Sequence, residues 1–485
     1  GQPYAVRVLS SGSHLARTQV STLQRMAKIL NLFACALLFR HACIGSAYRT
    51  KAFPIRPYGG TPVAIPLADD FTFLPTFFSS PTGPVTRVLV IVHGSNRNPG
   101  IYFEYALAGV LQANQGASTL VVAPWFNDHP GFQLGSRAIW NPVGLAATFY
   151  HTGDWCFGAR AGVNQTGPTS YEAFDTIFYY VHEKYPSITE WIATGFSAGS
   201  QFGSRWSIFS PLGQEGKGPG GKGKLLAIWG ASSTFCYLSD LRPNASCIVD
   251  ENTGPALNCT LFGPPVKTCY KQFDHYPYGL QHLGSRRRRT ATEEQSGLSA
   301  YLEKTYGLSG SISHLDIASK FANKNVIFSV GTRDQRSCSK GSCNDHCGSM
   351  MQGSNRLQRN LNYYKSLEET LSKPGAPYAT KYSIFVGSHD PSIFFGTDYF
   401  NQQVFGPDAS GFEIPPDAFL GYCFYLPGCF SYGMWPVIWF YGIFIFVCCI
   451  SISYAIWQFL KSKALDDIES TDTDFEDDGS ASGSE

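Results

Sequence analysis

One short segment of this chain has the residue types and the spacing of a nucleophilic serine. Residues 195–199 read GFSAG and match the pattern G-x-S-x-G. The pattern lies between a predicted strand at 191–195 and a predicted helix at 198–209, a context in which a sharp turn exposes the Ser197 hydroxyl. The two glycines let the backbone pass closely, and the start of a helix favours a developing anion. The spacing therefore predicts that Ser197 is a nucleophile.

A serine hydroxyl is a weak nucleophile and needs a neighbouring base. His389 follows a predicted strand late in the chain, in GSHD, and Asp334 follows another, in GTRD. The order Ser197, Asp334, His389 is that of α/β-hydrolases, and it predicts a nucleophile, an orienting acid and a general base. Asp390 is the alternative acid, but as the neighbour of His389 it is poorly placed to orient that ring, so we predict Asp334.

Acyl transfer also needs two donors where negative charge develops. We expect one to be the backbone N–H of Ala198, directly after the nucleophile. The other should come from the segment His93-Gly94-Ser95-Asn96, which follows a predicted strand, and we choose the Ser95 N–H. The alternative interpretation of this segment is a plain β-turn.

Strands and helices alternate along the part of the chain that must position these residues. This rhythm predicts an α/β fold with a doubly wound, mostly parallel sheet covered on both faces. Residues 235–320 interrupt it with four cysteines, two glycosylation sequons and the run Arg286–Arg289, and we interpret them as a disulfide-rich cap insertion. The arginine run is either a convertase cleavage site or an exposed basic loop. The predicted strands are 87–94, 119–125, 191–195, 225–230, 325–331 and 381–387, and the predicted helices are 101–111, 171–185, 198–209 and 354–372.

Two apolar segments predict the topology. Residues 434–460 contain no charge and are long enough for a transmembrane helix, with tryptophans near both ends and lysines directly after it. A buried core helix is the alternative. Residues 26–47 have the layout of a secretory signal peptide, although Arg40 interrupts it, and an uncleaved anchor or a chance apolar helix is the alternative. The domains would be a signal peptide (26–47), an ectodomain (48–430), a membrane span (434–460) and an acidic cytosolic tail (461–485).

Composition limits the classes of function. The chain has 485 residues, of which 44% are apolar, as is ordinary for a globular protein. Lys and Arg total 37 against 36 Asp and Glu, a balance that gives no reason to expect nucleic acid. The 11 histidines form no H-E-x-x-H or H-x-H pattern, so neither a metal nor another cofactor is predicted. Residues 466–485 hold nine acids and no base and should be disordered.

The cysteines agree with an oxidising compartment. An even number in the predicted ectodomain permits five disulfides, although the pairing does not follow from sequence. The segment CSKGSCNDHC at 338–347 lacks the paired C-x-x-C of a zinc site, so we favour disulfides over metal there. Sequons at Asn164, Asn244 and Asn258 are possible N-glycosylation sites. The ectodomain cysteines are 156, 236, 247, 259, 269, 338, 343, 347, 423 and 429.

Several segments together resemble a poorly characterised family of secreted or membrane-anchored, esterase-like serine hydrolases with the α/β-hydrolase fold. They are HGSNRNPGIYFEYAL, GFSAGSQFGSRW, GTRD, QGSNRLQRNLNYY and VGSHD, and they span about residues 85–400. The resemblance implies a Ser-Asp-His hydrolase of carboxylic esters, or of amides, that uses no metal. The 235–320 insertion, the extra cysteines and the anchor depart from simpler members.

These observations predict a single-pass type I membrane protein whose ectodomain faces the lumen or the exterior. Its expected partners are a small-molecule or acyl-ester substrate and the membrane. The preferred function is ester hydrolysis through an acyl-enzyme formed on Ser197. The alternatives are a peptidase or acyltransferase with the same three residues, or an inactive ectodomain used for adhesion or binding.

Overall fold

The computed structural model describes residues 60–412, apart from 68–72, 128–137, 139, 141–154, 163–165, 245–261, 266–272, 281–297, 307–313, 341–342 and 373–378. The chain divides into two compact units, Gly1–Ile414 and Pro415–Glu485, and every described residue belongs to the first. The predicted signal peptide, membrane span and acidic tail therefore lie outside the described residues. Among those that are described, no helix has the length and apolar character needed to cross a bilayer.

A single mixed sheet of eight strands forms the centre of the fold. Its strand order is β1-β2-β4-β3-β5-β6-β9-β10, in which β2 runs antiparallel to both neighbours and the strands from β4 to β10 are parallel. This arrangement is the α/β-hydrolase fold and confirms the predicted α/β class with a mostly parallel sheet. The strands are β1 (Thr61–Pro66), β2 (Phe73–Phe78), β3 (Arg87–Val92), β4 (Thr119–Pro124), β5 (Glu190–Phe196), β6 (Lys224–Gly230), β9 (Asn325–Gly331) and β10 (Lys381–Phe385).

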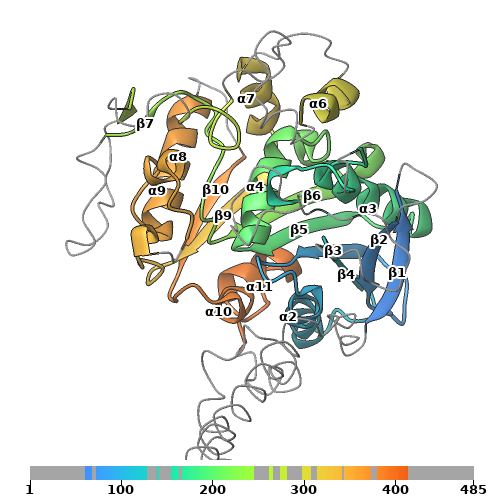
Figure 1. Ribbon diagram of the computed structural model, residues 1–485. Coiled ribbons are helices and arrows are strands. Elements are labelled where there is room, and N and C mark those ends of the chain that lie inside the picture. Colours follow the sequence, from blue (N-terminus) through green and yellow to red (C-terminus); the bar gives the residue numbers. More distant parts are fainter. Residues whose placement is uncertain are drawn as a thin grey trace, which may run out of the picture. The chain divides into compact units, whose positions relative to one another are not determined.

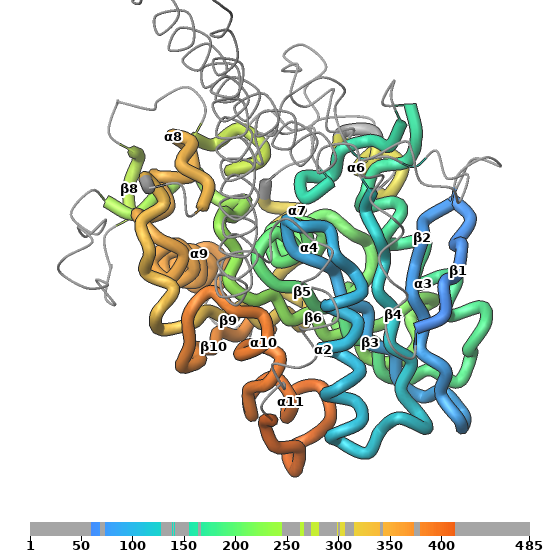
Figure 2. The backbone as a smooth tube through the Cα atoms, turned by 60° about the horizontal axis from the view of Figure 1, so that its bottom comes forward, coloured from blue at the N-terminus to red at the C-terminus, as the bar shows by residue number. Residues whose placement is uncertain are grey.

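Helices cover both faces of the sheet, as the parallel strands require (Figure 1). The helices α2 (Pro99–Gln112), α10 (Pro391–Phe395) and α11 (Asp398–Phe405) lie on one face, which comes forward in Figure 2. On the other face are α3 (Ser170–Lys184), α4 (Ala198–Phe209) and α7 (His314–Ala322), and α9 (Arg356–Leu371) packs on β9 and α7. A 3-10 turn at Trp155–Phe157 packs against α3 and α4.

The helices begin where the sequence offers caps. Thr169 and Glu172 form a capping box at the start of α3, in which each side chain accepts from the other residue's backbone N–H. α9 begins at Arg356, two residues after the start of the predicted helix at 354, and its N-cap is Asn355, whose side chain accepts from the Gln358 N–H. Ser354, the first residue of the predicted helix, lies before this cap and donates its hydroxyl to Gln358 Oε1 at 3.0 Å.

The segment that we interpreted as a cap insertion contains short elements in its described parts. These are β7 (Arg242–Pro243) and β8 (Phe262–Gly263), which pair with each other, and α6 (Leu298–Tyr306). α7 begins within 235–320 and ends just after it, and it packs against α4 and α9.

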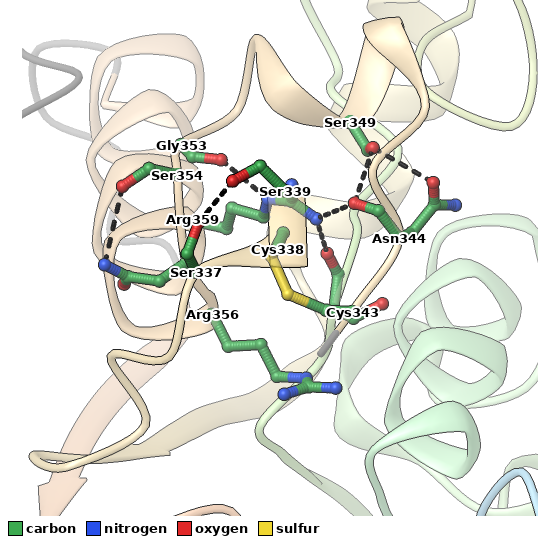
Figure 3. The surroundings of a disulfide bond; sticks show 12 residues. Ser337, Cys338, Ser339, Cys343, Asn344, Ser349, Gly353, Ser354, Arg356 and Arg359 are labelled. Atoms are coloured by element: carbon green, nitrogen blue, oxygen red, sulfur yellow. Dashed lines mark hydrogen bonds between the residues drawn. A yellow bond between two sulfur atoms is a disulfide. The ribbon is translucent and has the colours of Figure 1, made fainter. Parts of the chain in front are cut away.

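The cysteines only partly follow the disulfide prediction. A disulfide joins Cys338 to Cys343, and Cys347 is also disulfide-bonded. The described bond therefore lies after the insertion, in the loop that precedes α9 (Figure 3). Cys236, at the start of the insertion, is instead a buried thiol whose pKa burial raises to about 12. The insertion's other cysteines, at 247, 259 and 269, lie outside the described residues.

α4 approaches the sheet closely because a glycine faces it. A Cβ built on Gly203 would overlap the ring of Trp229 on β6. That ring is fully buried, and its Nε1–H donates to Ser207 Oγ at 2.8 Å, one turn further along α4. Gly203 therefore fixes the distance between the helix that follows Ser197 and the strand beside it.

We expect Gly203→Ala to destabilise the protein even though alanine is the better helix former. Overpacking a core costs about 1–3 kcal/mol, against a helical gain of about 1 kcal/mol. Urea unfolding followed by tryptophan fluorescence measures the difference. Gly109→Ala on α2 is the matched control, because its Cβ would meet its nearest neighbours at 3.3 Å. Equal effects of the two substitutions on the unfolding free energy would contradict this account.

Candidate active site

Ser197 lies at the sharp turn between β5 and α4. Its backbone has φ 59° and ψ −116°, a region that residues other than glycine rarely adopt. The turn is held because the Ser197 N–H donates to the Gly230 carbonyl at 2.9 Å, at the end of the neighbouring strand. Strained backbone of this kind persists where the surrounding structure enforces it, and it is concentrated at functional sites.

The two glycines of the GFSAG segment are required by close backbone contacts. A Cβ on Gly199 would lie 2.5 Å from the Val92 carbonyl oxygen and 2.7 Å from that of His93. A Cβ on Gly195 would lie 2.9 Å from the Gly199 backbone. The first turn of α4 therefore sits directly on the end of β3, which brings the Ser197 turn beside the loop that follows His93.

The structure brings the three predicted residues into one hydrogen-bonded chain. His389 Nε2 lies 2.9 Å from Ser197 Oγ, and His389 Nδ1 lies 2.7 Å from Asp334 Oδ2. With Nδ1–H donating to the carboxylate, Nε2 is left to accept the serine proton. Asp334 follows β9 and His389 follows β10, so neighbouring parallel strands deliver both side chains to the carboxyl end of the sheet.

The surroundings favour the charge states that this arrangement needs. Burial alone would raise the pKa of Asp334, but His389 and then Arg356 outweigh it, so the pKa is lowered and the carboxylate stays ionised. The pKa of His389 is lowered from its ordinary value, first by burial and then by the Arg356 cation, against the opposing pull of Asp334. His389 is therefore neutral at pH 7, as a general base must be.

Asp390, the alternative acid, has a different role. It is the N-cap of α10, and its Oδ1 accepts from the Ser392 N–H at 2.8 Å and from the Ser392 hydroxyl at 2.7 Å. These bonds turn its side chain into α10. Asp334 is the carboxylate that contacts the His389 ring.

The His93 side chain hydrogen-bonds to the loop that is proposed to supply an oxyanion donor. The ring of His93 is buried, and its Nε2 accepts from the Phe126 N–H at 3.1 Å. Its proton is therefore on Nδ1, which donates to the Gly94 carbonyl at 2.9 Å. Because the Gly94 carbonyl and the Ser95 N–H belong to one planar trans peptide, this bond also directs the Ser95 N–H the opposite way.

The two predicted donors lie on segments that the fold brings together. Ala198 is the first residue of α4, where N–H groups have no acceptor within the helix. Ser95 is exposed in the turn that follows β3, and the start of α4 packs on Val92 and His93 just before it. Gly94 has no room for a side chain, because a Cβ there would lie 2.5 Å from the Tyr102 hydroxyl. The fold thus brings the segments that carry the two predicted donors together, and residues 94–97 form a β-turn in which the Arg97 N–H donates to the Gly94 carbonyl at 3.1 Å.

Arg356 belongs to the site, although no sequence motif predicted a chemical role for it. Its Nη1 lies 3.4 Å from Asp334 Oδ1, on the oxygen that His389 does not use. The signal was present in the QGSNR segment at 352–356, which carried part of the family resemblance without any chemical role. Of the predicted glycosylation sites, Asn244 is exposed, whereas Asn164 and Asn258 lie outside the described residues.

Neither a family model nor a curated protein sequence matches this chain. Solved structures do match. Poly(aspartic acid) hydrolase-1 from Sphingomonas sp. KT-1 is 14% identical, with a TM-score of 0.43 over 72% of this chain and 99% of that one. LpqC, a poly(3-hydroxybutyrate) depolymerase from Bordetella parapertussis, is 15% identical, with a TM-score of 0.43 over 68% and 85%.

The esterase Pf2001 from Pyrococcus furiosus is 13% identical, with a TM-score of 0.33 over 71% of this chain and 90% of that one. Identities this low concern the fold alone. At TM-scores below 0.5, nothing about the activity or substrate of this chain follows from them.

We expect the nucleophilicity of Ser197 to persist below the ordinary pKa of histidine. The neutral imidazole is the reactive form, so reactivity is full above the His389 pKa and falls as the pH drops through it. Because that pKa is lowered from 6.5, the acid midpoint should lie below pH 6.5. The rate of fluorophosphonate labelling across pH measures it, with buffers of constant ionic strength as the control. A midpoint above 6.5 would contradict the assignment.

Proposed function

We propose that this protein is a serine hydrolase that cleaves carboxylic esters through an acyl-enzyme on Ser197. One observation carries the proposal: Ser197, His389 and Asp334 form a continuous hydrogen-bonded chain, with separations of 2.9 and 2.7 Å, at a strained strand-to-helix turn. A structural serine needs neither the strained backbone nor a base that an acid orients.

In the proposed reaction, Ser197 Oγ attacks the acyl carbon while His389 Nε2 takes its proton. Asp334 stabilises the imidazolium that forms. The resulting oxyanion is bound by the N–H groups of Ala198 and Ser95. The tetrahedral intermediate then collapses, His389 returns the proton to the leaving alcohol, and the acyl group remains on Ser197. Water, deprotonated by His389, releases the acid by the same route and regenerates the enzyme.

We place the enzyme on a membrane, with its hydrolase unit in the lumen of the secretory pathway or outside the cell. The uncharged segment 434–460 and the basic residues after it support this proposal. The disulfide between Cys338 and Cys343 supports it as well, because such bonds are rare in the cytosol. Peptidase and acyltransferase activities use the same three groups, so the acceptor and the acyl substrate must be found by assay.

Labelling of Ser197 by a fluorophosphonate tests the enzyme reading directly. The full chain in a detergent-solubilised membrane fraction should form a covalent adduct, and Ser197→Ala should abolish it, because the adduct forms on an activated hydroxyl. In-gel fluorescence measures both, and Ser200→Ala, on a serine three residues along α4, is the matched control that keeps the label. A folded wild-type protein that does not label would favour the adhesion alternative.

The two neighbouring acids can be separated by mutation. Asp334→Asn should lower kcat/KM for a p-nitrophenyl ester by roughly 10³- to 10⁴-fold. The imidazolium loses its negative partner, and the His389 ring is no longer held in the tautomer that leaves Nε2 free to accept a proton. Asp390→Asn removes a helix-cap charge outside the hydrogen-bonded chain and should change kcat/KM by less than about tenfold. Steady-state kinetics of the two variants decides between them, with circular dichroism as the check on folding. The opposite ranking would make Asp390 the acid.

A further inference from the structure

The QGSNR segment and the helix that it begins have a role in the site that the hydrolase mechanism does not explain. We propose that Arg356 is a positioning residue: its guanidinium holds Oδ1 of Asp334 so that Oδ2 faces His389, and its charge extends the reactivity of Ser197 to lower pH. This inference rests on the proposed serine hydrolase function and assigns a residue that the three-residue mechanism does not contain.

The first support is the burial of both charged groups. The side chain of Asp334 is 1% exposed and that of Arg356 is 8% exposed, and Nη1 lies 3.4 Å from Oδ1. Within the part of the chain that the structure describes, the side-chain bonds of Asp334 are this one and the 2.7 Å bond to His389. A buried carboxylate oxygen without a partner is costly. The Arg356 guanidinium therefore stabilises the orientation in which Oδ1 faces Arg356 and Oδ2 faces His389.

The second support is that the first turn of α9 binds both the side chain and the backbone carbonyl of Asp334. Arg356 is the first residue of α9, and the next residue, Leu357, donates its N–H to the Asp334 carbonyl at 3.0 Å. Asn355 caps this turn by accepting from the Gln358 N–H. The main chain and the side chain of the acid are thus both tied to the first turn of α9.

The third support is that the segment before Arg356 is fastened to another part of the fold. Gln352 is fully buried, and its side-chain amide accepts from the Phe235 N–H at 2.9 Å and donates to the Phe235 carbonyl at 2.8 Å. Gly353, at φ 147°, presents its carbonyl to Arg359 Nε at 2.8 Å. These contacts set where α9 begins, and therefore where Arg356 meets Asp334.

Arg359, one turn along the same helix, provides the internal comparison. It is also fully buried, but its guanidinium donates to the carbonyls of Ser233 and Asn344, at 2.7 and 2.8 Å, as well as to that of Gly353. In the view of Figure 3, Arg359 passes above the Cys338–Cys343 disulfide toward Asn344, whereas Arg356 lies below it. Arg359 therefore binds backbone carbonyls of the loops around α9, whereas Arg356 contacts the Ser197–His389–Asp334 chain.

The charges around His389 give the direction of the effect. Asp334 and Asp390 favour the imidazolium, whereas Arg356 opposes it, and burial opposes it most strongly. Loss of the Arg356 cation removes one of the two influences that lower the pKa of His389. The pKa then rises, and the serine becomes unreactive at a higher pH than in the wild-type protein.

Three substitutions at Arg356 separate its charge from its hydrogen bond. Arg356→Lys keeps the charge, Arg356→Gln keeps a donor without the charge, and Arg356→Met keeps the buried stem with neither. The experiment measures fluorophosphonate labelling rates of the full chain, in solubilised membranes, between pH 4.5 and 9, together with the melting temperature. Arg359→Lys, which alters a buried arginine outside the hydrogen-bonded chain, is the matched control.

We expect the acid midpoint of the Gln and Met variants to rise by about one pH unit. The Met variant should also lose roughly 10- to 100-fold of the plateau rate, because the carboxylate is misplaced. The Lys variant should keep the wild-type midpoint. Arg359→Lys should lower the melting temperature and leave the midpoint where it is.

The outcomes distinguish a failure of the proposed Arg356 role from a failure of the proposed serine hydrolase function. If wild type labels and the Gln and Met variants keep its midpoint and plateau while only their melting temperatures fall, Arg356 is structural and the inference is overturned. If wild type does not label, the proposed hydrolase function itself fails. Should the Gln variant not fold, the midpoints of the Met and Lys variants, measured against Arg359→Lys, still decide.

Discussion

The ionised carboxylate of Asp334 is the interaction around which this site is arranged. A buried carboxylate is costly unless hydrogen bonds and opposite charges satisfy its oxygens. Here one oxygen contacts the His389 ring and the other contacts the Arg356 guanidinium. The carboxylate orders groups from three separate strand ends and helix starts, because β9 brings Asp334, β10 leads to His389 and α9 begins at Arg356. Ser197, at the turn after β5, joins this arrangement through its hydroxyl, which lies 2.9 Å from His389 Nε2.

The second constraint is backbone geometry, and it acts independently of charge. Ser197 adopts a positive φ because the first turn of α4 is pressed onto the end of β3, where Gly199 faces the carbonyls of Val92 and His93. The same contact places the start of α4 beside the Gly94–Ser95 peptide, whose direction His93 fixes. One close approach between a helix and a strand therefore holds Ser197, the proposed nucleophile, at its turn and brings together the segments that carry the two N–H groups proposed to bind an oxyanion.

Most of the parallel sheet could be predicted from the sequence because its strands are continuous apolar runs. The predicted strand at 325–331 and the predicted helix at 198–209 coincide with β9 and α4. The β1–β2 pair was missed, because TPVAIP contains two prolines and is mostly exposed, and FLPTFF carries a proline within the strand. Prolines of this kind are tolerated near the edge of a sheet but remove the pattern by which a strand is recognised.

The residues of the hydrogen-bonded chain could be predicted for a reason that does not extend to Arg356. Ser197, Asp334 and His389 each follow an apolar strand, and parallel strands deliver the residues after them to one edge of the sheet. Arg356 instead begins a helix that an ordinary capping pattern marks, and a buried arginine that pairs with a carboxylate has the same sequence appearance as Arg359, which binds carbonyls. The two arginines differ in the direction that their side chains take from successive turns of α9. This direction depends on where α9 begins, which the hydrogen bonds between the Gln352 side chain and the Phe235 backbone determine. A contact between residues 117 positions apart therefore decides which arginine enters the site, and no local pattern encodes it.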